Sequence, residues 1–120
     1  MAEPIRLVLV EDNQVFREAL ELLLGLRSDI EVVGSAAGGA EGVEVCRRLQ
    51  PDVALIDYRM PGLDGAQATR ALLEASPGTR VICLTASVSE DERRLVLEAG
   101  AVACVTKDDG LDRIVEAIRA

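Results

Sequence analysis

Five polar side chains stand where separate apolar runs of this sequence end, and their types point to metal and phosphate chemistry. Glu11 and Asp12 follow one run, and Asp57 ends a second. Thr85 ends a third run, and Lys107 follows a fourth. Three carboxylates brought together repel one another unless a cation lies among them. Mg²⁺ suits such a site better than Zn²⁺, because the candidate ligands are all hard oxygen atoms.

With a cation nearby, Asp57 has the chemistry of a nucleophile, because its carboxylate could accept a phosphoryl group and become an acyl phosphate. Lys107 would place a positive charge beside the transferring oxygens, and electrostatics of this kind supply most of the catalysis of phosphoryl transfer. Thr85 could donate a hydroxyl hydrogen bond to a phosphoryl oxygen. Each residue alone has an ordinary structural explanation, such as a helix cap or a solvated charge. Their joint occurrence at the ends of four strands is what favours a site.

These groups can meet only if the apolar runs are parallel strands. Runs of strand length alternate with segments of helical periodicity, and we expect strands over residues 5–10, 30–36, 53–57, 80–85 and 101–106. This alternation predicts a parallel sheet covered by helices on both faces. Right-handed crossovers return every strand in the same direction, so the carboxyl ends of the strands share one edge of the sheet. Ligands of open α/β sheets bind at that edge.

Helices are expected after each strand. Apolar residues of the first fall on one face at i, i+4, i+7, i+8 and i+11, namely Val15, Ala19, Leu22, Leu23 and Leu26. The second and third helices stop before Pro51 and Pro77, whose rings disfavour helix at the preceding residue. Ser89 and Glu92 have capping-box spacing before the fourth helix, and Gly100 is placed to close it.

Composition narrows the class of protein. A chain of 120 residues with 49% apolar content is about one domain. Its net charge of -8 disfavours contact with nucleic acid or anionic membranes, because the field of the protein would repel both. The start of the sequence is unlike a signal peptide, and no apolar segment approaches the roughly 20 residues that span a bilayer. We therefore expect a cytoplasmic protein that binds neither membranes nor nucleic acid directly.

The cysteines do not form a recognisable metal or redox motif. Cys46, Cys83 and Cys104 are odd in number and lack CxxC spacing. The chain has no histidine, so a Cys/His zinc site lacks its ligands. We expect three reduced thiols that mostly serve core packing.

Four motifs, LVLVEDN, ALIDYRMPGLDG, VICLTA and GAVACVTKDD, resemble those of the bacterial response-regulator receiver domain of two-component systems. The resemblance extends from Ile5 to Ile118. It implies a flavodoxin-like, doubly wound (βα)5 fold with a five-stranded parallel sheet of order 2-1-3-4-5. It also implies that residues 1–120 are a single receiver domain with no output domain in this chain. The ending TKDDGLDRIVEAIRA is most similar to receivers attached to LuxR-type (NarL/FixJ-like) output domains, so we expect the regulatory part of such a transcriptional regulator.

The resemblance implies a role for each acidic candidate. Asp57 matches the phosphoacceptor of the family. Glu11, Asp12 and Asp57 match its Mg²⁺ ligands, together with the main-chain carbonyl of Arg59. The implied reaction is transfer of a phosphoryl group to Asp57 with Mg²⁺ as the cofactor.

The resemblance also identifies a switch. Thr85 matches the switch hydroxyl, and Lys107 matches the phosphoryl-binding lysine. Cys104 departs from the family, whose members usually carry an aromatic residue three positions before the lysine. In the family, phosphorylation moves that ring and the switch hydroxyl inward together and alters the surface of the fourth helix, fifth strand and fifth helix. A cysteine has little bulk to move, so Cys104 either simply packs or has a thiol that tunes or oxidises the switch.

The leading interpretation is a signalling module and not an enzyme. Asp57 would receive its phosphoryl group from a sensor histidine kinase, and the added charge would change a surface that a partner recognises. Because the chain has no histidine, the donor must be another protein or a small phosphodonor. A homodimer is expected through either the fourth helix, fifth strand and fifth helix, or the first and fifth helices.

Three other functions compete with this one. A receiver-like interaction module that works without phosphorylation stays open because of Cys104, although Asp57, Thr85 and Lys107 are all present. A hydrolase of the haloacid dehalogenase type would carry a second aspartate two residues after its nucleophile, where this chain has Arg59. Nucleotide binding is disfavoured because neither GxGxxG nor GxxxxGK[ST] occurs.

Overall fold

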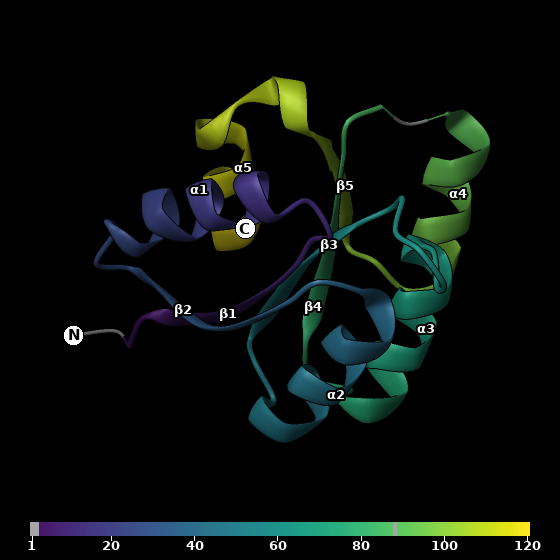
Figure 1. The fold of residues 1–120 in the computed structure, drawn as a ribbon, viewed down its shortest axis with the longest axis horizontal. Coiled ribbons are helices and arrows are strands. Elements are labelled where there is room, and N and C mark those ends of the chain that lie inside the picture. The colour runs from purple at the N-terminus through teal and green to yellow at the C-terminus, as the bar shows by residue number, and fades with distance from the viewer. Residues whose placement is uncertain (1–2, 88) are drawn as a thin grey trace.

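A computed structural model describes residues 3–87 and 89–120, and it shows one twisted sheet between two layers of helices (Figure 1). The strands of the described residues are β1 (Ile5–Val10), β2 (Ile30–Ala36), β3 (Val53–Asp57), β4 (Arg80–Thr85) and β5 (Ala103–Thr106). They are all parallel and lie in the order β2-β1-β3-β4-β5. The predicted flavodoxin-like, doubly wound fold and its strand order are confirmed.

The fifth strand begins two residues later than predicted, at Ala103 instead of Ala101. Ala101 belongs to the turn that closes the preceding helix, because its main-chain N–H donates to the carbonyl of Val96 at 3.1 Å. Gly100 adopts a φ of +118°, which favours glycine, and closes that helix as predicted. An apolar residue directly after a helix cap is easily mistaken for the first residue of a strand.

Helices cover both faces of the sheet (Figure 1). The elements are α1 (Gln14–Gly25), α2 (Gly39–Leu49), α3 (Gly65–Ala75), α4 (Glu90–Glu98), the 3₁₀ turn η1 (Lys107–Asp109) and α5 (Leu111–Arg119). Helices α1 and α5 pack on one face, and α2, α3 and α4 pack on the other. The capping box of α4 is present, since the Ser89 hydroxyl accepts from the main chain of Glu92. No helix within the described ranges is long and apolar enough for a bilayer crossing.

Helix α1 forms as predicted, but the apolar stripe identified in its sequence faces outward. Val15, Leu22 and Leu26 are 78%, 68% and 77% exposed. The residues that α1 directs toward the sheet are instead Phe16, Leu20 and Leu24. Leucines occupy more than one side of this helix, so periodicity alone allowed two rotations about the helix axis. Packing against β1 and β2 selected the line of Phe16, Leu20 and Leu24.

Candidate functional site

The ends of β1 and β3 bring the three acidic candidates together. Val10 and Ile56 are register partners on these neighbouring strands, so Glu11 and Asp57 follow side by side. Carboxylate oxygens of Glu11, Asp12 and Asp57 all lie within 4.8 Å of one another. Glu11 is 2% exposed and Asp57 is 8% exposed, whereas Asp12 faces solvent. The site is thus a partly buried acidic cluster with one open side.

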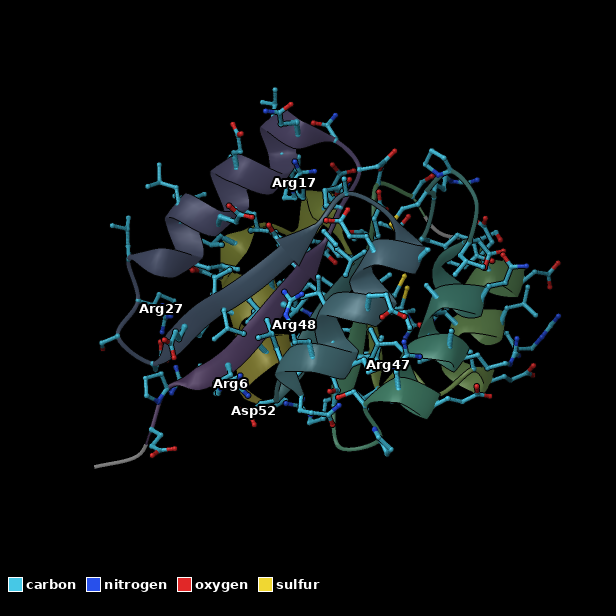
Figure 2. All side chains as sticks on the ribbon, turned by 60° about the horizontal axis from the view of Figure 1, so that its bottom comes forward. Arg6, Arg17, Arg27, Arg47, Arg48 and Asp52 are labelled. Carbon is cyan, nitrogen blue, oxygen red and sulfur yellow. The ribbon has the colours of Figure 1, made fainter. Side chains whose placement is uncertain are left out.

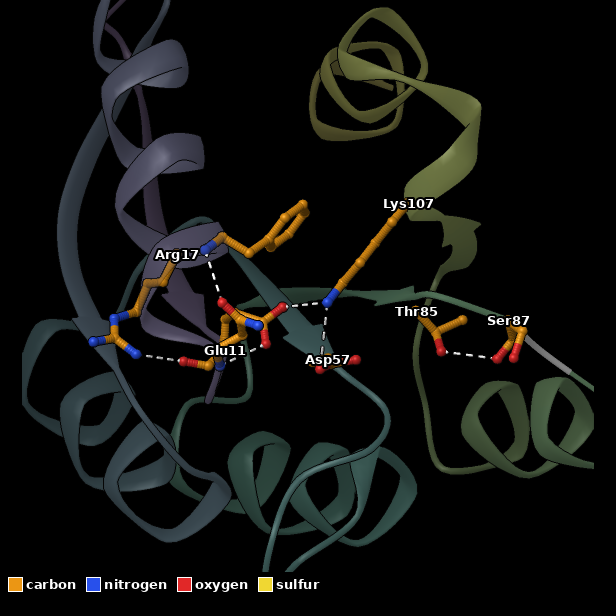
Figure 3. Close-up of polar contacts among 8 residues, drawn as sticks. Glu11, Arg17, Asp57, Thr85, Ser87 and Lys107 are labelled. Atoms are coloured by element: carbon orange, nitrogen blue, oxygen red, sulfur yellow. Dashed lines mark hydrogen bonds and ion pairs between the residues drawn. The ribbon is translucent and has the colours of Figure 1, made fainter.

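Lys107 reaches the cluster from the far side of β4. It is the first residue of η1, directly after β5, and its extended side chain points toward the acids (Figure 3). The Nζ atom lies 2.6 Å from Oε1 of Glu11 and 3.5 Å from Oδ2 of Asp57. It also lies 4.2 Å from the centre of the Phe16 ring, a distance suited to a cation–π contact. Lys107 therefore pairs first with Glu11, while Asp57 receives a longer and weaker contact.

Two residues that the sequence reasoning missed, Asn13 and Arg17, hold Glu11 in place, and the Arg17 contact is visible in Figure 3. The main-chain N–H of Asn13 donates to Oε2 of Glu11 at 3.0 Å, and Nη1 of Arg17 donates to the Glu11 carbonyl at 2.7 Å. The Asn13 side chain caps α1 by accepting from Phe16 N at 3.0 Å. A helix-capping residue type directly before α1 was a readable signal for Asn13. Periodicity offered no such signal for Arg17, or for Phe16 beneath Lys107.

The two buried carboxyl groups differ in their electrostatics. Burial, together with the neighbouring Glu11 carboxylate, raises the pKa of Asp57 to about 6. Burial alone would also raise the pKa of Glu11, but hydrogen bonds from Lys107 and Asn13 hold it below its usual value. Asp57 is therefore the group whose negative charge is least compensated. A compact set of carboxylate oxygens with excess negative charge and an open side fits a hard divalent cation such as Mg²⁺.

Thr85 lies at the end of β4, between the strands that carry Asp57 and Lys107, as predicted. Its side chain is buried, and its hydroxyl donates to the main-chain carbonyl of Ser87 at 2.9 Å. Figure 3 shows this hydroxyl directed toward Ser87 and not toward Asp57. The position of Thr85 follows from the strand pattern, whereas the direction of its hydroxyl does not.

The other two candidates lie at the border of the site. Arg59 follows Asp57 by two residues, and its exposed side chain pairs with Glu92 of α4 at 2.9 Å between Nη2 and Oε1. Cys104 lies on β5 with its side chain 8% exposed. Nη1 of Arg93 donates to the Cys104 carbonyl at 3.2 Å. Both contacts tie α4 to the carboxyl end of the sheet.

Comparison with known proteins identifies the family of this arrangement. Residues 7–119 match the family described as the response regulator receiver domain. The chain is 38% identical over 116 residues to the transcriptional regulatory protein LiaR of Bacillus subtilis, which covers 97% of this chain and 55% of LiaR.

Solved structures agree with that match. The receiver domain of the putative response regulator NarL from Mycobacterium tuberculosis superposes with a TM-score of 0.89 at 33% identity, covering 99% of both chains. A LuxR-family two-component response regulator from Aurantimonas gives a TM-score of 0.86 at 30% identity, covering 96% of this chain and 84% of that one. The predicted likeness to receivers of LuxR-type regulators is confirmed. The chain spans about half the length of the curated relatives it matches.

Proposed function

Since this chain belongs to the response regulator receiver domain family, we propose that Asp57 accepts a phosphoryl group from a sensor histidine kinase. The observation that carries this proposal is the placement of Asp57 at the sheet edge. It is a partly buried carboxylate within 4.8 Å of two other acids, with the Lys107 ammonium 3.5 Å away. An undercompensated carboxylate in such a place is a nucleophile close to fixed positive charge.

In the proposed step, one carboxylate oxygen of Asp57 attacks the phosphorus of a phosphohistidine. The P–N bond breaks, and its electron pair stays with the imidazole of the kinase. Glu11, Asp12, Asp57 and the main-chain carbonyl of Arg59 would hold Mg²⁺. When bound, this ion would supply positive charge to the phosphoryl oxygens.

Lys107 and Thr85 have complementary roles in this proposal. Lys107 would move its ammonium from Glu11 toward a phosphoryl oxygen, a short shift because both carboxylates already lie within 3.5 Å of Nζ. Thr85 would turn its hydroxyl from the Ser87 carbonyl toward another phosphoryl oxygen. That rotation would free the Ser87 carbonyl and so carry the state of Asp57 to the loop before α4.

A second part of the proposal concerns the surface through which two copies of the chain would form a homodimer. We infer that the surface of α1 and α5, and not that of α4, β5 and α5, forms the homodimer contact. The support is the exposed apolar stripe of α1, in which Val15, Leu22 and Leu26 are each more than two-thirds exposed.

The similarity to LuxR-family proteins and the coverage of about half of the relatives support a regulatory role in a longer transcriptional regulator.

The test is mass spectrometry of the chain after incubation with acetyl phosphate and Mg²⁺. We expect the intact mass to rise by one phosphoryl group in the wild type and not in Asp57→Asn. The matched control is Asp52→Asn, which removes an acid at the opposite end of β3 and should leave labelling unchanged. An unlabelled wild type, or equal labelling of wild type and Asp57→Asn, would refute the assignment of Asp57.

A further inference from the structure

Two of the three cysteines lie directly opposite each other on neighbouring strands. Cys83 of β4 and Cys104 of β5 are register partners. Both side chains belong to the core cluster on the α2, α3 and α4 face, so they point to the same side of the sheet. Neighbouring strands lie about 4.7–4.9 Å apart, within the Cα separation of about 4.4–6.8 Å that disulfides span. The backbone thus already places the two residues at bonding range.

The two cysteines of this pair differ in reactivity. The pKa of Cys104 is lowered to about 7, first by the thiol of Cys83 as a hydrogen-bond donor and also by the positive charge of Arg93, against the opposing effect of burial. The pKa of Cys83 is strongly raised by its hydrogen bond to Cys104 and by burial. Cys104 is therefore the thiolate of the pair, and Cys83 is the thiol that keeps its proton.

Exposure and position also single out Cys104. It lies on β5, an edge strand of the sheet, and is 8% exposed, whereas Cys83 is fully buried. Cys46 offers an internal comparison, because it is fully buried on α2 and burial raises its pKa to about 11. A small oxidant therefore meets a nucleophilic sulfur at Cys104 alone among the three cysteines.

We propose that Cys83 and Cys104 form a peroxide-sensitive thiol pair, in which Cys104 is oxidised first and Cys83 resolves it to a disulfide. The Cys104 thiolate attacks one oxygen of hydrogen peroxide, the O–O bond breaks, and hydroxide leaves, so that sulfur becomes a sulfenic acid. The sulfur of Cys83 then attacks the sulfenic sulfur of Cys104, and the S–O bond breaks. Water leaves with the Cys83 proton, and the S–S bond forms.

The position of this pair joins it to the switch region. Cys83 precedes Thr85 by two residues, Cys104 precedes Thr106 by two, and Thr85 and Thr106 are themselves register partners. A disulfide here would link β4 to β5 two residues before Thr85. Oxidation would thus act on the strand pair next to the acidic cluster through a chemistry that does not require phosphorylation of Asp57.

Peptide mapping of the whole chain tests the proposal. The reduced protein is treated with hydrogen peroxide, remaining thiols are alkylated, and the protein is digested with trypsin. Cleavage after lysine and arginine separates all three cysteines, which fall in peptides 28–47, 81–93 and 95–107. We expect peptides 81–93 and 95–107 to be linked, with a mass lower than their sum by two hydrogen atoms, while Cys46 stays reduced.

Two variants establish the order of the steps. In Cys83→Ser, whose hydroxyl keeps a hydrogen-bond donor beside Cys104, the sulfenic acid should persist on Cys104 and be trapped by dimedone. In Cys104→Ala peroxide should leave Cys83 reduced. In the wild type, Cys104 should be alkylated at least about tenfold faster than Cys46 at neutral pH. The proposal is overturned if peroxide links no peptides in the wild type or joins only different molecules, or if Cys46 reacts as fast as Cys104. These wild-type readouts do not depend on the folding of either variant.

Discussion

The two ends of the sheet treat their polar groups in opposite ways. At the amino end, Arg6 donates from its main chain to Asp52 at 2.8 Å and from its guanidinium to the carbonyls of Leu49 and Gln50 at 2.8 and 2.9 Å (Figure 2). At the carboxyl end, three carboxylates lie within 4.8 Å of one another, and the Lys107 ammonium contacts those of Glu11 and Asp57 (Figure 3). Donors and acceptors match at the first end, whereas negative charge exceeds positive charge at the second.

The two ends differ in charge balance but not in whether their buried polar atoms are hydrogen-bonded. Among the described residues, every buried side-chain nitrogen and oxygen atom has a hydrogen-bond partner, at both ends of the sheet. No fully buried polar atom of the acidic cluster therefore lacks a hydrogen bond, and what distinguishes this end is unneutralised charge. An excess of negative charge lowers the stability of the folded state, and a bound cation can reduce that cost. The amino end combines matched donors and acceptors, and the carboxyl end keeps an excess of negative charge.

The largest effect should come from removing the cation of the acidic end. We expect Lys107→Ala to slow labelling of Asp57 by acetyl phosphate by about 10²–10³-fold, because one electrostatic stabiliser of the transferring group is lost. The rate of mass increase measures this effect. The matched variant, Arg6→Ala, removes a cation from the amino end and should lower stability without slowing labelling. If labelling of Asp57 slowed equally in both variants, the difference in charge between the two ends of the sheet would not explain the reactivity of Asp57.

A smaller effect concerns stability and its dependence on pH. The folded-state pKa of Asp57, about 6, is above its ordinary value of 3.8. Its ionisation therefore opposes folding, and this contribution to stability falls as pH rises from about 4 to 6. Two pKa units correspond to roughly 3 kcal/mol, so Asp57→Asn should raise the free energy of unfolding by up to about that amount at pH 7 in the presence of a chelator.

Denaturant unfolding of both proteins at several pH values measures that gain. Below about pH 4 the difference between wild type and Asp57→Asn should shrink, because the carboxyl is protonated in both the folded and unfolded states. Addition of Mg²⁺ should stabilise the wild type more than Asp57→Asn. A variant that is less stable than the wild type at pH 7 without metal would contradict the excess of charge inferred at this end.

The smallest expected effect is the loss of stability when a buried hydrogen bond is removed at the amino end of the sheet. The Thr79 hydroxyl lies 2.6 Å from that of Ser76 and donates to the Pro51 carbonyl at 2.7 Å. We expect Thr79→Val to lower the free energy of unfolding by about 1–2 kcal/mol, since buried partners lose their hydrogen bonds. Labelling of Asp57 should be unchanged. Thr85→Val, the same substitution at the acidic end, should instead change the rate at which acetyl phosphate labels Asp57. Equal labelling rates in the two variants would count against the proposed role of Thr85.

Much of this architecture could be predicted from the sequence, because it depends on local patterns. Short apolar runs separated by helical periodicity specify parallel strands, and parallel strands place their carboxyl ends at one edge. That rule places Glu11, Asp12 and Asp57 at one edge, whereas the strand order that makes β1 and β3 neighbours was predicted from the resemblance to the receiver family. The capping box at Ser89 and the closing role of Gly100 were likewise readable, because a cap depends on residues within one turn.

Tertiary structure decided everything that depends on rotation about an axis or on the choice between nearby partners. It selected Phe16, Leu20 and Leu24 for the core and left the other stripe of α1 outside. It paired Lys107 with Glu11 more closely than with Asp57. Periodicity defines which residues share a face but not which face meets the sheet, and spacing places two groups at one edge without choosing their rotamers. Those choices are made only when all packing and electrostatic contacts are satisfied together.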